Sequence, residues 1–357
     1  MREGKDIVAV SIPFSAGVAT AAYLPPGSVS PDLAAGACCI AAAGLLALCC
    51  RKSGKTAALM PMFFFTGMLC CFTALSSVCP ERQQGGLPQR ALEALSSVID
   101  GCGFPHGQTG PLVKALISGQ RESLSPETVN AFRNSGAAHI LSLSGLHMGV
   151  IYGILHKSLA WVGRSRFAAT AKAILTITAA GFFTLMTGCG PSVTRAFLFI
   201  VINETARLLP GRKRRPVAVL CTALMIQLIA NPMNIKSVSF QLSYLAMLAI
   251  FTLFPTLDSW YPRSGRRDPM RRIWTSAALT VSCQIFTAPL AWWYFRSFPA
   301  YFLISNLIAL PLSECLILCS VVTVAASAAG LCPDMLKGLT DLLAQALVKT
   351  LEIISSL

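Results

Sequence analysis

The chain has 357 residues, of which 54% are hydrophobic and only 12% are charged, and its formal net charge is +14. Soluble domains carry about 25% charged residues, so this composition excludes a soluble enzyme and predicts a membrane protein. The excess of Lys and Arg has three candidate explanations, which are membrane topology, contact with DNA and contact with anionic lipid.

Apolar stretches long enough to cross a bilayer as helices recur along the sequence. A spanning helix needs about 20 mainly apolar residues, and we therefore predict an all-α, polytopic membrane protein with about 10–11 transmembrane helices. The predicted spans are residues 7–24, 33–50, 57–78, 138–162, 167–187, 191–209, 216–230, 238–257, 273–295 and 300–331. Pro311 lies at the centre of the last stretch, where its missing N–H favours a break in the helix.

One long loop, residues 79–137, is not apolar enough to span. Apolar residues at helical spacing predict short amphipathic helices over 88–99 and 111–117, lying at the membrane interface. The glycine-rich segment 101–110 between them predicts a turn. Ser125, followed by Pro126 and Glu127, has the pattern of a helix N-terminus, and that helix would lead the chain to His139.

Basic residues alternate between successive loops. If Arg2 and Lys5 keep the N-terminus inside, the inner loops hold the basic clusters, and the short outer loops hold almost no Lys or Arg. This is the positive-inside pattern, so topology explains most of the net charge, and the same register places the loop 79–137 outside. The inner clusters lie within residues 51–55, 157–166, 207–215 and 263–272.

Most of the fourteen cysteines lie in predicted spans and have no metal-binding spacing, so we interpret them as small apolar packing residues and expect no metal or cofactor. Cys79 and Cys102 both fall in the outer loop, where a disulfide is chemically possible. Gly54-Lys55-Thr56 resembles the end of a phosphate-binding loop, but Cys49 stands where that loop requires a glycine. An ATPase site is therefore not expected.

The segment from His139 to Gly149 concentrates polar side chains within an apolar stretch. Ser142, Ser144 and His147 must face other helices or water, because an unpaired polar group in hydrocarbon costs several kcal/mol. Ser144 and His147 are three residues apart and could share a hydrogen bond on a helix, which raises an intramembrane serine hydrolase as one alternative. The sequence lacks the G-x-S-x-G elbow of that class and offers no obvious acidic partner.

Charged residues within predicted spans are few. Arg195 lies in the first two turns of its span, where it either faces a partner or a wet cavity, or extends to the outer headgroups. Glu204 is expected to pair with Arg207 at i,i+3.

Several motifs in this order resemble the ComEC competence family, the inner-membrane channel for DNA uptake in bacteria. The matching segments are Ala115–Ser125, Ala131–Gly149 with its Ser-Leu-Ser-Gly-Leu-His-Met-Gly run, Gly188–Arg195, Asn231-Pro232, Ser239–Ala246, and the series Pro289, Phe295, Pro299, Asn306 and Pro311. The resemblance covers about residues 111–325. It implies a membrane channel for single-stranded DNA in the bacterial cytoplasmic membrane and not an enzyme, and a small-solute transporter on the same core is the runner-up.

The DNA path that this resemblance implies would need polar and cationic lining. Candidate lining residues are Ser142, Ser144, His147, Arg195, Gln241, Gln284 and Asn306, and the structural positions of the motifs are His139, Gly145, Gly149, Pro191, Ser192, Pro289 and Pro311. Trp292, Trp293 and Tyr294 are candidate stacking residues, although an interfacial aromatic belt has the same signature.

We expect four regions: N-terminal transmembrane helices in 1–78, the outer loop in 79–137, the competence-type channel core in 138–331 and a C-terminal helix in 332–357. The outer loop is too short for the OB-like domain that full-length family members commonly carry, and the zinc-nuclease signature is absent before Leu357. Import is therefore expected to need separate partners, which are a DNA receptor or nuclease outside and an ATP-driven motor inside, besides single-stranded DNA and membrane lipids.

Overall fold

The computed structural model describes residues 3–25, 30–50, 59–76, 86–161, 163, 165–208, 215–261, 268–296, 301–331 and 333–356. These residues form helices joined by turns, and no strand occurs among them. The predicted all-α class is confirmed. The chain divides into two compact units, one comprising Met1–Arg82 and Leu209–Phe251 and the other Gln83–Leu208 and Thr252–Leu357.

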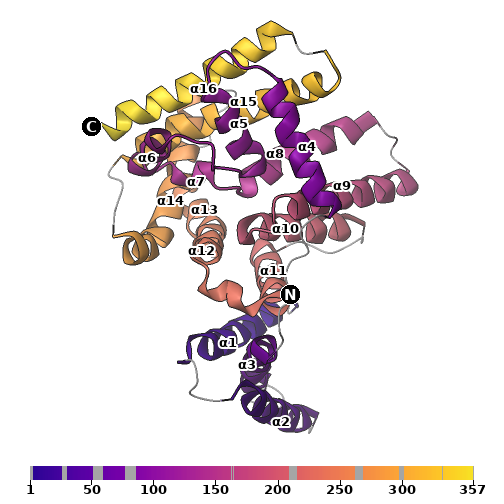
Figure 1. Cartoon of the computed structure of the whole chain (residues 1–357). Helices are drawn as coiled ribbons and strands as arrows, with labels where there is room; N and C mark the ends of the chain where they lie inside the picture. The colour runs from indigo at the N-terminus through magenta and orange to yellow at the C-terminus, as the bar shows by residue number, and fades with distance from the viewer. Residues whose placement is uncertain are drawn as a thin grey trace. The chain divides into compact units, whose positions relative to one another are not determined.

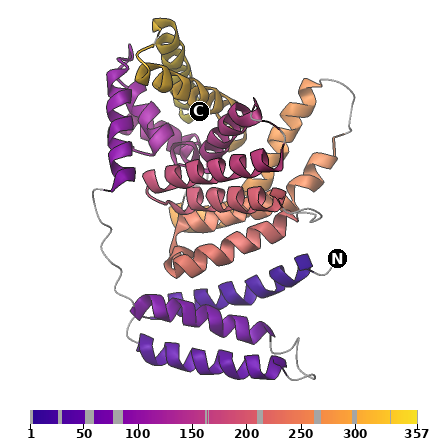
Figure 2. The same cartoon turned by 90° about the vertical axis from the view of Figure 1, so that its right-hand side faces the viewer.

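The first unit is a small bundle of apolar helices (Figure 1). Its elements are α1 (Glu3–Tyr23), α2 (Pro31–Cys50), α3 (Leu59–Ser76), α11 (Pro216–Ala230), the 3₁₀ helix η2 (Pro232–Lys236) and most of α12 (Val238–Thr252). Helix α3 packs against both α1 and α2, and Figure 2 shows these three as a stack. Helix α11 packs on α1.

Two glycines allow α1 and α3 to approach closely. A Cβ atom on Gly17 would lie 1.9 Å from the carbonyl oxygen of Phe64, and one on Gly67 would lie 2.1 Å from the carbonyl oxygen of Phe14. Both obstacles are backbone atoms, which cannot turn away as a side chain can. Small residues at such crossings let membrane helices gain van der Waals contact between their backbones.

Side-chain hydrogen bonds connect the remaining elements of the first unit. The Tyr244 hydroxyl of α12 donates to Oε1 of Gln227 on α11, at 3.0 Å. The Gln241 amide donates to the carbonyl of Ile235 at 2.6 Å and to the hydroxyl of Tyr23 at 3.2 Å. Through these bonds, Gln241 joins the start of α12 to η2 and α1.

The second unit contains the remaining helices (Figure 1). These are α4 (Leu87–Gly101), α5 (Thr109–Ser118), α6 (Pro126–Asn134), α7 (Ala138–Leu141), α8 (Gly145–Ser158), η1 (Leu159–Trp161), α9 (Arg166–Met186), α10 (Pro191–Leu208), α13 (Phe254–Ser259), α14 (Pro269–Phe295), α15 (Phe302–Ala328) and α16 (Asp334–Ser355). Helices α8, α9 and α10 pack on one another around Met148, Phe183, Val193 and Ile200.

The helices of the long loop form where the sequence predicts them. Helix α6 begins after Ser125, whose Oγ accepts the backbone N–H of Thr128 at 3.2 Å. Helices α4, α5 and α6 then pack against the hairpin of α15 and α16. The core shared by α5, α6, α15 and α16 includes Leu112, Leu116 and Phe132 from the loop, Leu316 from α15, and Leu347 and Leu351 from α16.

The structure corrects two predicted spans. Residues 138–162 do not form one helix, because α7 ends at Leu141 and α8 begins at Gly145. Helix α8 has 14 residues, or about 21 Å, which is shorter than a hydrocarbon core of about 30 Å. The predicted break at Pro311 is also wrong, since α15 runs through it without interruption from Phe302 to Ala328. Membrane helices tolerate proline where hydroxyls, neighbouring helices and small local adjustments satisfy the freed backbone groups.

The protein is a multi-pass membrane protein by the length and apolar character of its helices. Five described stretches are long and apolar enough to cross a bilayer: Leu59–Ser76, Arg166–Met186, Val238–Ser259, Pro269–Phe295 and Phe302–Ala328. Shorter apolar helical stretches are Ile7–Tyr23, Pro31–Ala47 and Pro216–Ala230. The four predicted regions stay predictions, and the compact units group residues 209–251 with the N-terminal helices.

Some sequence predictions fall outside the described residues. They include Cys79, and with it the bridge to Cys102, and the segment Gly54-Lys55-Thr56. They also include most of the basic clusters, namely Arg51–Lys55, Arg212–Arg214 and Arg263–Arg267.

Candidate functional site

The break between α7 and α8 is made by serine side chains. Ser142 follows the last residue of α7 in an extended conformation, and its Oγ donates to the carbonyl of His139 at 2.7 Å. Ser144 is also extended and caps α8, accepting the N–H of Leu146 at 3.2 Å. Serine hydroxyls compete with the backbone for hydrogen bonds in this way, which ends one helix and starts the next.

His147 completes the cap from inside the first turn of α8. Its Nδ1 accepts the backbone N–H of Ser144 at 3.2 Å and lies 3.2 Å from the Ser144 Oγ. Because Nδ1 accepts a hydrogen bond, the proton of the neutral ring is on Nε2. The ring is only 2% exposed, and Nε2 has no hydrogen-bond partner among the described residues. Buried polar atoms usually have a hydrogen-bond partner, and none of the described residues supplies one to Nε2.

Arg195 brings a positive charge to the same place. Its side chain is buried on α10, and a terminal guanidinium nitrogen lies 3.9 Å from the position that a Cβ on Gly145 would take. Gly145 is the first residue of α8, so the guanidinium lies against the N-terminal turn of that helix. The partial positive charge of a helix N-terminus adds to that of the guanidinium. The two together make this turn a favourable environment for an anion.

A second polar network joins α8 and α10 further along their length. The Tyr152 hydroxyl donates to Oε1 of Glu204 at 2.6 Å, and Nη1 of Arg207 donates to both groups at 2.7 Å. The ion pair predicted between Glu204 and Arg207 is confirmed. Sequence reasoning missed Tyr152, because nothing in its spacing from Glu204 indicates that α8 and α10 are neighbours.

Four of the seven predicted lining residues meet at the start of α8. They are Ser142, Ser144, His147 and Arg195. Asn306 lies on α15, and its Oδ1 is buried with no partner in the part of the chain that the structure describes. Gln284 is half-buried on α14, and Gln241 belongs to the first unit.

The predicted motif positions have different surroundings. His139 and Gly149 are exposed, Gly145 is the first residue of α8, and Pro191 and Ser192 begin α10. Pro289 and Pro311 lie inside α14 and α15.

The aromatic residues at the end of α14 are exposed. The exposed fractions of Trp292, Trp293 and Tyr294 are 53%, 68% and 41%. The Arg296 guanidinium lies 5.5 Å from the ring centre of Trp293, within the range of a cation–π contact. This position at a helix end fits an interfacial aromatic belt.

Ser144 and His147 do not form a hydrolase triad in this arrangement. The Ser144 Oγ accepts a backbone N–H as a helix cap, and no described carboxylate holds Nε2 of His147. No group of three or more His, Cys, Asp or Glu side chains within the described ranges could hold a metal ion.

Another cluster, absent from the sequence predictions, joins the loop after α4 to α16. Asp341 accepts hydrogen bonds from Thr109 Oγ1 at 2.5 Å and Gln345 Nε2 at 2.8 Å, and its Oδ2 lies 2.6 Å from Nδ1 of His106. Burial raises the pKa of Asp341, but the hydrogen bonds from Thr109, His106 and Gln345 outweigh it, so the net pKa is lowered from 3.8. His106 and Thr109 are more than 230 residues from Asp341 in sequence, which is why no local pattern predicts the cluster.

Comparison with known proteins identifies the family. The family model described as "Competence protein" matches residues 116–357, which is more than half of the chain. The chain belongs to the competence protein family. This confirms the resemblance seen in the sequence motifs, and the site at the start of α8 lies within the matched region.

Two relatives match parts of the chain. Over 141 residues it is 31% identical to ComE operon protein 3 of Bacillus subtilis (strain 168), which covers 40% of this chain and 18% of that protein. Over 207 residues it is 24% identical to Uncharacterized protein YcaI of Escherichia coli (strain K12), which covers 56% of this chain and 27% of that protein. The chain thus spans less than a third of the length of either curated relative. No solved structure matches it.

Proposed function

We propose that this protein forms a passive conduit for single-stranded DNA across the bacterial cytoplasmic membrane during natural transformation. Membership of the competence protein family supports a role in DNA uptake. The observation that carries the proposal is the buried guanidinium of Arg195 against the N-terminal turn of α8. DNA is a chain of phosphate anions, and it needs such cationic sites to leave water.

Other polar groups near Arg195 would line the path together with its guanidinium. Nε2 of His147 is buried without a partner among the described residues, so it is available to a phosphate oxygen, a base edge or water. The hydroxyls of Ser142 and Ser144 lie at the same break between helices. Non-helical backbone at membrane depth is tolerated only where it is buried in protein or lines a wet cavity.

The proposed conduit does no chemistry of its own. Moving one phosphate charge fully into a negative-inside cell costs about 2.3 kcal/mol per 100 mV, so the strand must be pulled. We propose that an ATP-driven motor inside supplies the pulling force, and that a receptor or nuclease outside delivers the strand. The basic inner loops would attract the emerging phosphates.

The test is transformation of a deletion strain that expresses variants of the chain. Arg195→Gln should lower DNA uptake about tenfold or more, equivalent to about 1.4 kcal/mol or more, and Arg195→Lys should restore part of it. Arg296→Gln is the matched control, because it removes an exposed cation at the end of α14. Full uptake by Arg195→Gln at normal protein abundance would contradict the proposal.

A further inference from the structure

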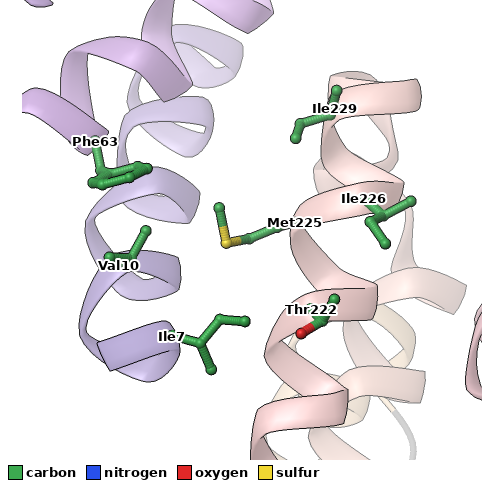
Figure 3. Close-up of a pocket in the computed structure, with 7 residues that line it drawn as sticks. All are labelled: Ile7, Val10, Phe63, Thr222, Met225, Ile226 and Ile229. Atoms are coloured by element: carbon green, nitrogen blue, oxygen red, sulfur yellow. The ribbon is translucent and has the colours of Figure 1, made fainter. Parts of the chain in front are cut away.

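The first unit contains an apolar groove between α1, α3 and α11 (Figure 3). Its volume is about 580 Å³, and one side is open. Ile7 and Val10 of α1 face Met225 of α11 across it, Phe63 contributes from α3, and Ile229 closes the far end of the α11 wall. Met225 points into the gap between the helices (Figure 3).

The side chains that line the groove are almost entirely apolar and provide few hydrogen-bond partners for water. Six of the seven lining residues have hydrocarbon or thioether side chains. The seventh, Thr222, already donates its hydroxyl to the Ala218 carbonyl at 2.9 Å. A buried water needs about 2–4 polar partners, so the groove does not hold a chain of ordered waters.

The helical stretches that form the groove are apolar along their length. The walls of the groove belong to Leu59–Ser76, which is apolar and long enough to cross a bilayer, and to the shorter apolar stretches Ile7–Tyr23 and Pro216–Ala230. An empty cavity forfeits the dispersion contacts of its whole lining. In a bilayer, lipid hydrocarbon is the filler available to an open groove between apolar helices.

A positive charge marks one end of the groove. Arg215 is exposed and caps α11, and it precedes Thr222 by seven residues, as Thr222 precedes Ile229. Seven residues make about two turns, so Thr222 and Ile229 follow one face of α11, and Arg215, in an extended conformation at the N-cap position, lies about 10 Å before Thr222 along the helix axis. The N-terminus of α11 adds its partial positive charge to the guanidinium.

We propose that this groove binds one acyl chain of an anionic phospholipid, with the lipid headgroup at Arg215. The chain fills the carbon-lined gap between α1 and α11, and the phosphate and guanidinium pair at the end of α11. This binding would hold α11 to α1 within the first unit. This proposal does not depend on the proposed DNA path.

The full-length protein in lipid nanodiscs provides the test. Phosphatidylglycerol and phosphatidylcholine, each with a photoactivatable diazirine in the acyl chain, would be compared, and the labelled peptides identified by mass spectrometry. We expect labelling at Ile7–Val10 and Thr222–Ile229, stronger with phosphatidylglycerol. Arg215→Gln should lower that preference about fivefold, whereas Arg272→Gln, which removes an exposed cation elsewhere, should not.

Filling the groove separates a bound lipid from the general lipid shell. Met225→Trp should abolish most of the labelling at Ile7–Val10, and Ile229→Trp serves as a second filling variant if the first does not fold. Ile174→Trp, on the exposed face of α9, is the control and should leave the labelling unchanged. Labelling that survives both filling variants, or that is equal for the two lipids, would overturn the proposal. Cross-links between two copies through these peptides would instead assign the groove to a second copy and would also overturn it.

Discussion

The close approach of α1 and α3 makes Gly67 the position at which one methyl group should do most harm. In Gly67→Ala the new Cβ would lie 2.1 Å from the Phe14 carbonyl oxygen and 3.0 Å from its carbonyl carbon. A carbon–oxygen contact normally measures about 3.3–3.6 Å, so the two helices must separate locally by about 1.2 Å or more. Overpacking of this kind costs about 1–3 kcal/mol.

The expected result is a lower thermal unfolding midpoint for the purified protein in detergent. At about 2–4 °C per kcal/mol, Gly67→Ala should lower Tm by at least 2 °C, and Gly17→Ala should behave alike because its Cβ would meet the Phe64 carbonyl oxygen at 1.9 Å.

The matched control is Gly36→Ala in α2 of the same unit. Nothing lies within 4 Å of its Cβ position, so the alanine should be neutral or stabilise the helix by about 0.5–1 kcal/mol. Equal midpoints for Gly67→Ala and Gly36→Ala would refute the close glycine crossing as a source of stability.

Three further predictions concern the second unit. Tyr152→Phe should lower the free energy of unfolding by about 1.5–3 kcal/mol, since it removes hydrogen bonds to charged groups. Tyr294→Phe, at the exposed end of α14, is the control and should not, so equal Tm values for the two variants would contradict this prediction. Because the pKa of Asp341 is lowered from 3.8 in the folded protein, its ionised carboxylate should stabilise the fold fully above that pH, and this stabilisation should be lost as the pH falls from 3.8 through the lower folded pKa; a stability–pH curve unchanged by Asp341→Asn would show otherwise. Since Nε2 of Gln345 on α16 lies 2.6 Å from Nδ1 of His106, cysteines introduced at Gln108 and Gln345 should react with an impermeant thiol reagent from the same side of the membrane, and labelling from opposite sides would disprove that contact.

Local patterns in the sequence were sufficient for the fold class and for the helices of the long loop. The predicted start of α6 at Ser125 rests on a cap, and a cap is made by residues within one turn. The pair of Glu204 and Arg207 is likewise local, being three residues apart on α10. Family membership was readable because its motifs are contiguous runs of residues.

Hydropathy alone could not place the break between α7 and α8. Apolar residues, Leu141 and Leu146, lie on both sides of the break. Hydropathy averaged over a long window therefore stays high there, although two serine hydroxyls redirect the backbone. At Pro311 the error was the opposite one, because the sequence predicted a break where the helix continues. A proline removes one hydrogen bond, and whether the helix continues depends on neighbours that the local sequence does not identify.

The sequence by itself determined the all-α membrane class, the family, and the polar residues that a membrane helix must hide, His147 and Arg195 among them. Only the tertiary structure decided which of those residues meet. Arg195 reaches Gly145 because α10 packs on α8, and Asp341 reaches His106 across 235 residues because α16 packs on α5. Hydrophobicity and capping act within a few residues of chain, whereas a binding site depends on distances between helices, and those are set by the packing of every side chain between them.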